Sequence, residues 1–244
     1  MIMKIGVVCE GPTDYPAITH FYSHALQERN ITAQFQPLYP ELDRTRPQGG
    51  WANVLMWLRN NPPATRINRY FGGGLFGGAL ATEPFDAIII HLDADILPND
   101  SFKKFVKENY AFEVLDTNDP TVRAKQISDL ISISARLVEM SNSDAAKHVA
   151  APAVESTETW CVAAFSMPPQ NFEEIRGRNL VNAFMRALEK SEGRTPLIDY
   201  ENIDKSHHRR IRFCKLHAIN SVRVVNGCPS FANSLEKLVS LHIY

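Results

Sequence analysis

The sequence contains few cysteines and no long apolar run, and each shortage excludes a class of protein. Its 4 cysteines are scattered among 244 residues, with no Cys-x-x-Cys pair and no histidine at zinc-finger spacing. This pattern excludes a disulfide framework and a zinc finger, and it indicates reduced thiols in a cytoplasmic protein. No segment approaches the roughly 18 apolar residues of a membrane span, and nothing resembles a signal peptide. We therefore expect a cytoplasmic protein with no membrane partner.

A phosphate-binding loop of the Walker A type is also missing. The glycine-rich run 72–78 lacks the Lys-Ser/Thr that completes that motif, so we interpret 66–80 as a mobile loop and a weak candidate for a lid. The net charge of −1 and the 44% hydrophobic content are ordinary for a globular protein. The length suits an α/β core with a helical appendage. We place the core at 1–167 and the helical C-terminal portion at 168–244.

The most informative stretch is the apolar run that leads into Leu-Asp-Ala-Asp. Three isoleucines, Ile88 to Ile90, lie between Pro84 and Pro98. A short continuous apolar run of this kind is typical of a central parallel strand that is buried on both faces. The sequence therefore predicts an α/β fold with a mostly parallel sheet.

Two carboxylates, Asp93 and Asp95, follow this strand. Ligands of open α/β sheets bind beyond the carboxyl ends of the strands, and residues two apart on extended backbone point to the same side. Like charges held so close raise each other's pKa unless a cation neutralises them. Mg²⁺ commonly takes one or two protein carboxylates and leaves its other positions to water and phosphate. The alternative is a capped turn, because Asp is common in turns.

A second acidic group follows the first predicted strand, 2–9. Glu10 comes directly after that strand, Gly11 and Pro12 break it, and Thr13 and Asp14 begin a predicted helix. We expect Glu10 to lie at the same edge of the sheet as the DxD pair. Two acidic groups that each follow a predicted strand indicate a ligand site more specifically than one such group does.

These two motifs resemble a known family. The sequence Glu-Gly-Pro-Thr-Asp at 10–14 is similar to the EGxT(D/E) signature of Toprim domains, the catalytic module of topoisomerases, primases and several nucleases, and Leu-Asp-Ala-Asp at 92–95 is similar to the DxD of that family. The closest likeness is to overcoming-lysogenization-defect nucleases and to stand-alone Toprim-like proteins of bacterial anti-phage loci. The resemblance implies a Rossmann-like Toprim fold and phosphodiester cleavage that depends on Mg²⁺ or Mn²⁺. It implies metal ligation by Glu10, Asp93 and Asp95, substrate contacts from Thr13 and Asp14, and a role for Glu10 in proton transfer.

A third acidic group follows the predicted strand 149–154. Ser156 or Thr157 can cap a helix there, and the helix dipole favours acids such as Glu155 and Glu158 in its first turn. Glu158-Thr159-Trp160 is also similar to a Glu-x-Trp that recurs in the stand-alone Toprim-like group. We therefore add Glu158 as a catalytic candidate and both glutamates as metal candidates.

The segment 204–217 is strongly basic, with five Lys or Arg and three His against one acid. Charge runs are usually solvated helix faces. A basic helix beside an acidic metal centre, however, suits a substrate with repeated phosphates. The residues predicted to contact substrate here are Lys205, Arg209, Arg210, Arg212 and Lys215.

The remaining pattern alternates helices with strands. Predicted strand 31–39 alternates apolar and polar residues and suits a position nearer the sheet edge. Predicted helices cover 15–29, 51–58, 101–110, 119–140, 179–190 and 230–241.

Three other functions compete with a metal-dependent nuclease. A nucleotide-sugar glycosyltransferase also places DxD after a strand, but it leaves the Glu-Gly and Glu-x-Trp motifs and the basic segment unexplained. An Asp-nucleophile phosphatase normally carries its DxD on the first strand, whereas this one is central. The sequence also leaves open a non-catalytic binding or accessory subunit that keeps the Toprim fold. The expected partners are nucleic acid, a partner ATPase and a second copy of the chain.

Overall fold

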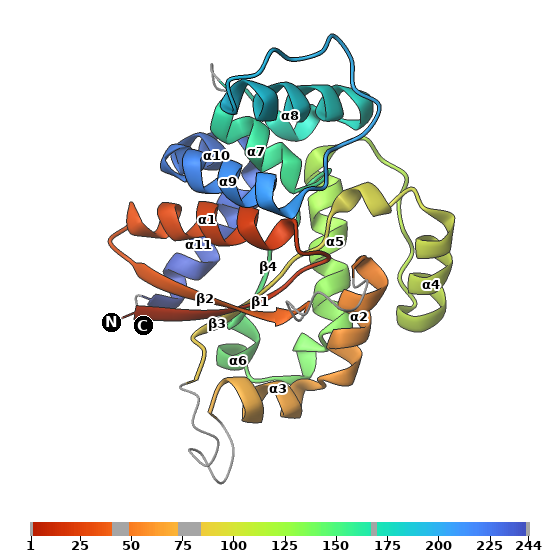
Figure 1. Cartoon of the computed structure of the whole chain (residues 1–244). Helices are drawn as coiled ribbons and strands as arrows, with labels where there is room; N and C mark the ends of the chain where they lie inside the picture. The colour runs from red at the N-terminus through yellow and green to blue at the C-terminus, as the bar shows by residue number, and fades with distance from the viewer. Residues whose placement is uncertain (1, 41–48, 73–83, 167–169, 243–244) are drawn as a thin grey trace.

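The sheet at the centre of the structure contains four parallel strands in the order β2-β1-β3-β4 among the described residues. This computed structural model describes residues 2–40, 49–72, 84–166 and 170–242. Helices cover both faces of the sheet (Figure 1). The arrangement confirms the predicted α/β, Rossmann-like class. The strands are β1 (Ile2–Val8), β2 (Thr32–Tyr39), β3 (Ala87–Ile90) and β4 (His148–Ala150).

The order of the strands follows from their side chains. Strand β3 is buried at every position, and it pairs with β1 on one side and β4 on the other. Strand β2 alternates exposed and half-buried residues along most of its length and lies at the edge, as its alternating sequence predicts. Along β3, Ile89 packs into one hydrophobic core while Ile88 and Ile90 pack into the other. The isoleucine run is thus apolar because both faces are covered.

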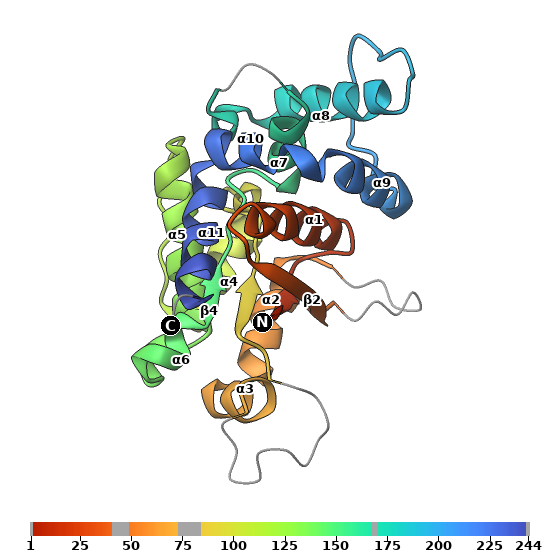
Figure 2. The ribbon, with the colours of Figure 1, turned by 90° about the vertical axis from the view of Figure 1, so that its left-hand side faces the viewer.

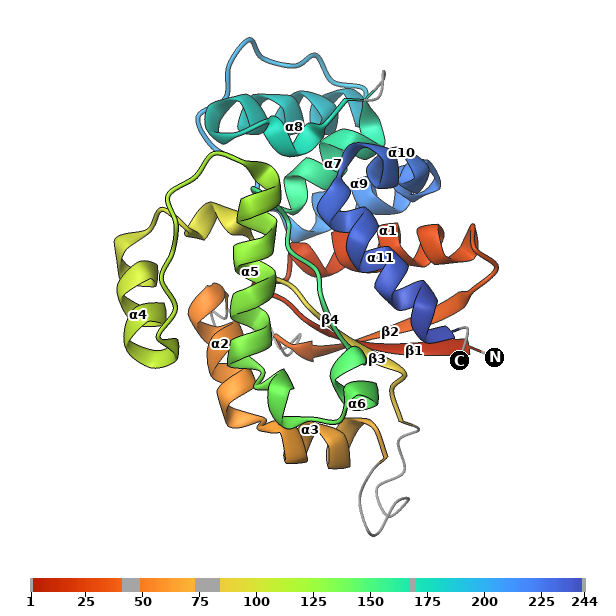
Figure 3. The same ribbon diagram turned by 180° about the vertical axis from the view of Figure 1, so that it is seen from behind.

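The helices form a layer on each face of the sheet (Figures 1 and 2). One core joins the sheet to α1, α7, α8, α9, α10 and α11, and the other joins it to α2, α4 and α5. Figure 3 shows α5 and α11 near strand β4, each of them in contact with it. The helices are α1 (Asp14–Gln27), α2 (Trp51–Asn60), α3 (Pro63–Tyr70), α4 (Asp100–Tyr110), α5 (Pro120–Ser134), α6 (Asn142–Ala146), α7 (Thr157–Phe165), α8 (Gly177–Ser191), α9 (His207–His217), α10 (Ser221–Gly227) and α11 (Pro229–His242).

Some segments differ from the sequence prediction. The helix predicted at 119–140 ends at Ser134 because Arg136 adopts a left-handed conformation, with φ of 53°. Strand β4 is shorter than the predicted 149–154, although Asp93 and Ala153 still form a bridge beyond it. Residues 63–70, part of which we predicted as loop, form α3. Residues 73–80 of the predicted loop lie outside the described residues.

The C-terminal portion shares its hydrophobic core with the sheet. Phe184, Phe213 and Phe231 belong to the same cluster of buried side chains as residues of β1 and α1. All four cysteines are buried free thiols, as expected. In the described part of the chain, every helix is too short or too polar to cross a bilayer.

Candidate metal centre

The carboxyl ends of β1 and β3 open into a cavity of about 440 Å³. Parallel strands deliver their carboxyl ends to one edge of the sheet, and this is where ligands of such folds bind. The cavity gathers side chains from the ends of β1 and β3, the starts of α1 and α7, and the segment before α9. Its lining comprises Glu10, Gly11, Pro12, Thr13, Asp14, Gly49, Gly50, Asp93, Asp95, Ser156, Glu158, Ile203 and Lys205.

Glu10 ties the end of β1 to the end of β3. Its Oε1 accepts a hydrogen bond from the backbone N–H of Asp93 at 2.8 Å. Burial and the neighbouring Asp93 carboxylate raise the pKa of Glu10 well above its usual value. A carboxylate in this state gains free energy from a cation, because the cation removes the repulsion that burial strengthens.

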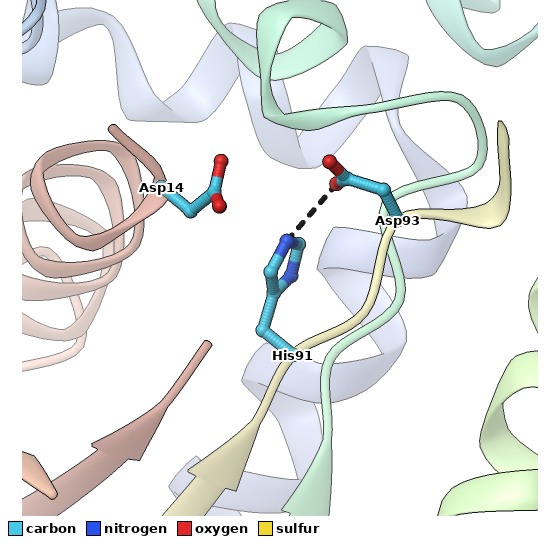
Figure 4. A group of neighbouring side chains, drawn as sticks. All are labelled: Asp14, His91 and Asp93. Atoms are coloured by element: carbon cyan, nitrogen blue, oxygen red, sulfur yellow. Dashed lines mark hydrogen bonds and ion pairs between the residues drawn. The ribbon is translucent and has the colours of Figure 1, made fainter. Parts of the chain in front are cut away.

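Asp93 lines the cavity and lies beside His91 (Figure 4). The two side chains are two residues apart on extended backbone, so they share a face. His91 Nε2 lies 3.0 Å from Asp93 Oδ1. Burial, followed by the Asp14 and Asp95 carboxylates, raises the pKa of Asp93 well above its usual value.

Asp14 is the first residue of α1 and completes this group from the opposite side (Figure 4). One ligand atom each from Asp14, His91 and Asp93 lie within 4.8 Å of one another. Asp14 Oδ1 accepts a hydrogen bond from Thr157 Oγ1 at 2.9 Å. Burial raises the pKa of Asp14, while the nearby His91 lowers it in part. We had predicted Asp14 as a substrate contact; the structure groups it with the metal candidates.

His91 is the residue of this group that our sequence analysis missed. A single histidine inside an apolar run is usually a core residue, so its residue type alone does not mark it as a ligand. Its position two residues before Asp93 was the available signal, because residues two apart on a strand share a face.

Asp95 is exposed at the mouth of the cavity, in the short 3₁₀ helix that follows Asp93. Partial burial by the cavity walls, together with repulsion from Glu155 and Glu158, raises the pKa of Asp95 to about 6. The charges of Lys205 and Arg123 oppose this shift. Asp93 and Asp95 both line the cavity. Asp95, however, lies in a 3₁₀ helix and not on the extended backbone from which the DxD spacing predicts a shared face.

Glu158 also lines the cavity, but its charge is already neutralised. Arg210, which is 1% exposed, forms an ion pair with Glu158. Burial raises the pKa of Glu158, but the Arg210 charge and the hydrogen bonds to the carboxylate outweigh it, so its pKa is lower than usual. Our prediction that Arg210 contacts substrate is wrong, because its guanidinium points inward to Glu158 and Thr157.

Two further predicted residues lie outside the cavity lining. Glu155 Oε2 accepts a hydrogen bond from Arg123 at 2.7 Å, and Glu155 Oε1 accepts one from the backbone N–H of Gly177. Arg209 forms ion pairs with Glu189, Glu192 and Asp204. The prediction that Arg209 contacts a substrate phosphate is therefore wrong, because its guanidinium already forms ion pairs with three carboxylates.

The remaining predicted contacts lie at the surface. Thr13 lines the cavity at the N-cap position of α1, but its side chain makes no capping hydrogen bond. Lys205 lines the cavity and is the only Lys or Arg among its described lining residues. Arg212 and Lys215 are exposed on α9.

These residues fit a divalent cation. The cavity offers carboxylate oxygens from Glu10, Asp14, Asp93 and Asp95. The buried His91, which is outside the described lining, places one imidazole nitrogen near Asp14 and Asp93. Burial and mutual repulsion raise the pKa values of the four carboxyl groups, which is the condition that a bound cation relieves.

Comparisons of the chain with family models, with curated proteins and with solved structures find no match.

Proposed function

We propose that this protein hydrolyses phosphodiester bonds of nucleic acid with a divalent cation, Mg²⁺ or Mn²⁺, held in the cavity at the carboxyl edge of the sheet. The observation that carries the proposal is the convergence of Glu10, Asp93 and Asp95 from two neighbouring strands on one cavity. When bound there, a divalent cation would supply a charge that activates water, orients the phosphate and stabilises the leaving oxygen.

The side chains around the cavity have different roles in the proposed reaction. Asp93 and Asp95, which both line the cavity, supply oxygen ligands. Glu10 is held against the backbone of Asp93 through Oε1, which leaves its other oxygen, Oε2, for proton transfer. Lys205 supplies a positive charge at the cavity for a substrate phosphate. The exposed Arg212 and Lys215 of α9 extend this positive charge away from it.

The Toprim resemblance supports the same assignment, because its two motifs supply Glu10 and the DxD pair. Within that resemblance, we propose a role in bacterial anti-phage defence, with a partner ATPase and with a homodimer as the working form.

The test is a cleavage assay on the purified protein with plasmid, single-stranded DNA and tRNA. Cleavage with Mg²⁺ or Mn²⁺ that is absent with chelator, and that Asp93→Asn abolishes while nucleic acid still binds, supports the proposal. Binding without cleavage under every condition supports a non-catalytic subunit instead. Turnover of a nucleotide sugar, with no cleavage of nucleic acid, supports a glycosyltransferase.

A further inference from the structure

His91 is buried where a histidine without a partner is costly. Its side chain has no exposed surface, and its ring packs edge-on against the buried Trp160, with 5.5 Å between ring centroids. A buried imidazole must find partners for both nitrogens, because an unpaired polar group in the interior loses its hydration without compensation.

One of these partners fixes the tautomer of the ring. His91 Nδ1 lies 2.8 Å from the backbone carbonyl oxygen of Ala151, which lies just beyond β4. A carbonyl oxygen can only accept, so Nδ1 carries the hydrogen and donates it. In the neutral ring, Nε2 then presents a lone pair to Asp93 Oδ1, which is 3.0 Å away and is also an acceptor when ionised. Two acceptors at this distance require either a cation beside them or a proton on one of the two, Nε2 or the Asp93 carboxyl.

A carbonyl that holds Nδ1 is also what metal-binding histidines use. A ligating imidazole almost always donates its other N–H to a carbonyl, a carboxylate or water, which orients the ring and raises its basicity. The Ala151 carbonyl lies outside the Asp14, His91 and Asp93 group, so its hydrogen bond is independent of the clustering of those side chains.

The distances allow one ion to contact all three side chains. Ligand atoms at about 2.1 Å from a common cation lie no more than ~4.2 Å apart, and the three ligand atoms lie within 4.8 Å of one another. A small side-chain rotation closes the group onto an ion. Thr157 holds Asp14 in place through Oδ1, which leaves Oδ2 of Asp14 for the ion.

We propose that Asp14, His91 and Asp93 form a nitrogen-containing cation site that selects a transition ion, Mn²⁺ or Zn²⁺, over Mg²⁺. Imidazole is a favoured ligand of Zn²⁺, and Mn²⁺ accepts it in a mixed nitrogen and oxygen shell, whereas Mg²⁺ prefers a shell of oxygens and gives up its water reluctantly. Two carboxylates also neutralise a divalent charge in the buried site. This proposal deepens the proposed function, since the site shares Asp93 with it, but it concerns ion selection and can be tested without cleavage.

The direct test is the electron-spin-echo spectrum of the 244-residue chain after a chelator has removed any bound metal and Mn²⁺ has been added. The proposal expects a ¹⁴N modulation from a directly bound imidazole in the wild type and none in His91→Gln. Calorimetry should show that Zn²⁺ and Mn²⁺ bind more tightly than Mg²⁺. His91→Gln should weaken Zn²⁺ and Mn²⁺ by about 100-fold or more, because even second-shell changes cost roughly 10- to 100-fold. It should change Mg²⁺ affinity far less.

The matched control is His148→Gln, which replaces a buried histidine on β4 that does not belong to the Asp14, His91 and Asp93 group. It should keep the ¹⁴N signal and all three affinities. Even where His91→Gln fails to fold, the wild-type spectrum alone shows whether an imidazole nitrogen binds Mn²⁺ directly. Bound Mn²⁺ without ¹⁴N coupling overturns the proposal and leaves His91 as a proton-bearing partner of Asp93, as does equal affinity for Mg²⁺ and Zn²⁺.

The two proposals fail separately. A protein that cleaves nucleic acid and shows no ¹⁴N coupling keeps the nuclease function and loses the nitrogen site. A protein with the ¹⁴N coupling that cleaves nothing with any ion keeps the site and loses the nuclease function.

Discussion

Arg210 of α9 and Glu158 of α7 form a buried ion pair between the C-terminal helices and the cavity wall. Arg210 also donates to Thr157 Oγ1 at 3.2 Å, and Thr157 donates to Asp14. The guanidinium additionally lies over the ring of Phe184, 4.6 Å from its centroid. The positive charge of Arg210, from the last third of the chain, therefore stabilises two carboxylates that line the cavity, those of Glu158 and Asp14.

Arg210→Met should destabilise the protein by about 3–5 kcal/mol, because it leaves the buried Glu158 carboxylate without its charged partner. Equilibrium unfolding in urea, followed by circular dichroism, measures the change. The double variant Arg210→Met with Glu158→Gln should recover much of the loss, since it removes both charges. Arg178→Met breaks an ion pair with Asp199 whose side chains are 58% and 51% exposed, and it should barely move the unfolding midpoint. A double variant no more stable than the single one would contradict this account.

The strands and their acidic ends could be predicted from the sequence because the signals are local. A run of buried isoleucines predicts β3 wherever it lies in the chain, and the DxD at 93–95 follows it directly. The parallel arrangement then brings Glu10 to the same edge, and the structure gives the contact between Glu10 and Asp93.

The prediction that Arg210 contacts substrate is wrong because a run of charged residues does not indicate which side of a helix faces inward. Arg209, Arg210 and Arg212 are close in sequence, but successive residues on a helix point about 100° apart. Arg210 is buried, whereas Arg212 is exposed and Arg209 meets three carboxylates. Only the packing of α9 on α1 and α7 decides this. The partners of His91 could not be predicted from the sequence either, since Ala151 and Asp14 are distant from it along the chain.

Asp95→Asn should raise the stability of the metal-free protein at pH 7. The charged form of Asp95 is disfavoured by the cavity walls and by Glu155 and Glu158, which raise its pKa to about 6. The same substitution should shrink the stabilisation by Mn²⁺, because an ion that binds only the folded state stabilises it in proportion to its affinity. Thermal unfolding with chelator and with Mn²⁺ measures both effects. Asp116→Asn, which alters an exposed pair with Lys103, should give the same shift with and without the ion.

Removal of the exposed basic residues of α9 should weaken the binding of nucleic acid without dependence on its sequence. For Arg212→Ala with Lys215→Ala, the slope of log affinity against log salt should fall by about 1.4–1.8, which is roughly 0.7–0.9 for each phosphate contact. A salt titration of fluorescence anisotropy measures the slopes. The control, Lys104→Ala with Lys107→Ala on α4, removes the same charge and should leave the slope unchanged. Equal slopes in all three proteins would mean that α9 presents only a solvated face.

His148 should make the stability of the protein fall in mild acid. It is buried, its Nδ1 donates to the Asp144 carbonyl, and its Nε2 accepts a hydrogen bond from Arg66 Nε at 3.0 Å. Burial and the Arg66 charge lower the pKa of His148 to about 4, although Asp144 opposes the shift and Lys147 adds to it.

The sign of the pH effect follows from the proton that the unfolded chain takes up. Unfolded histidine has a pKa near ~6.5, so between pH 6.5 and 4 the unfolded state binds a proton that His148 in the folded state does not. Folding is therefore penalised progressively as the pH falls, by about 3 kcal/mol once the pH reaches 4. In His148→Gln the amide oxygen can still accept from Arg66, but this penalty is absent. The stability of the wild type relative to this variant should thus fall by about 3 kcal/mol from pH 7 to pH 4 in urea titrations. Ser143→Ala, on the neighbouring helix α6 and without a titrating group, should follow the wild type throughout. Parallel curves for the wild type and His148→Gln would show that His148 takes up its proton as readily in the folded protein as in the unfolded chain.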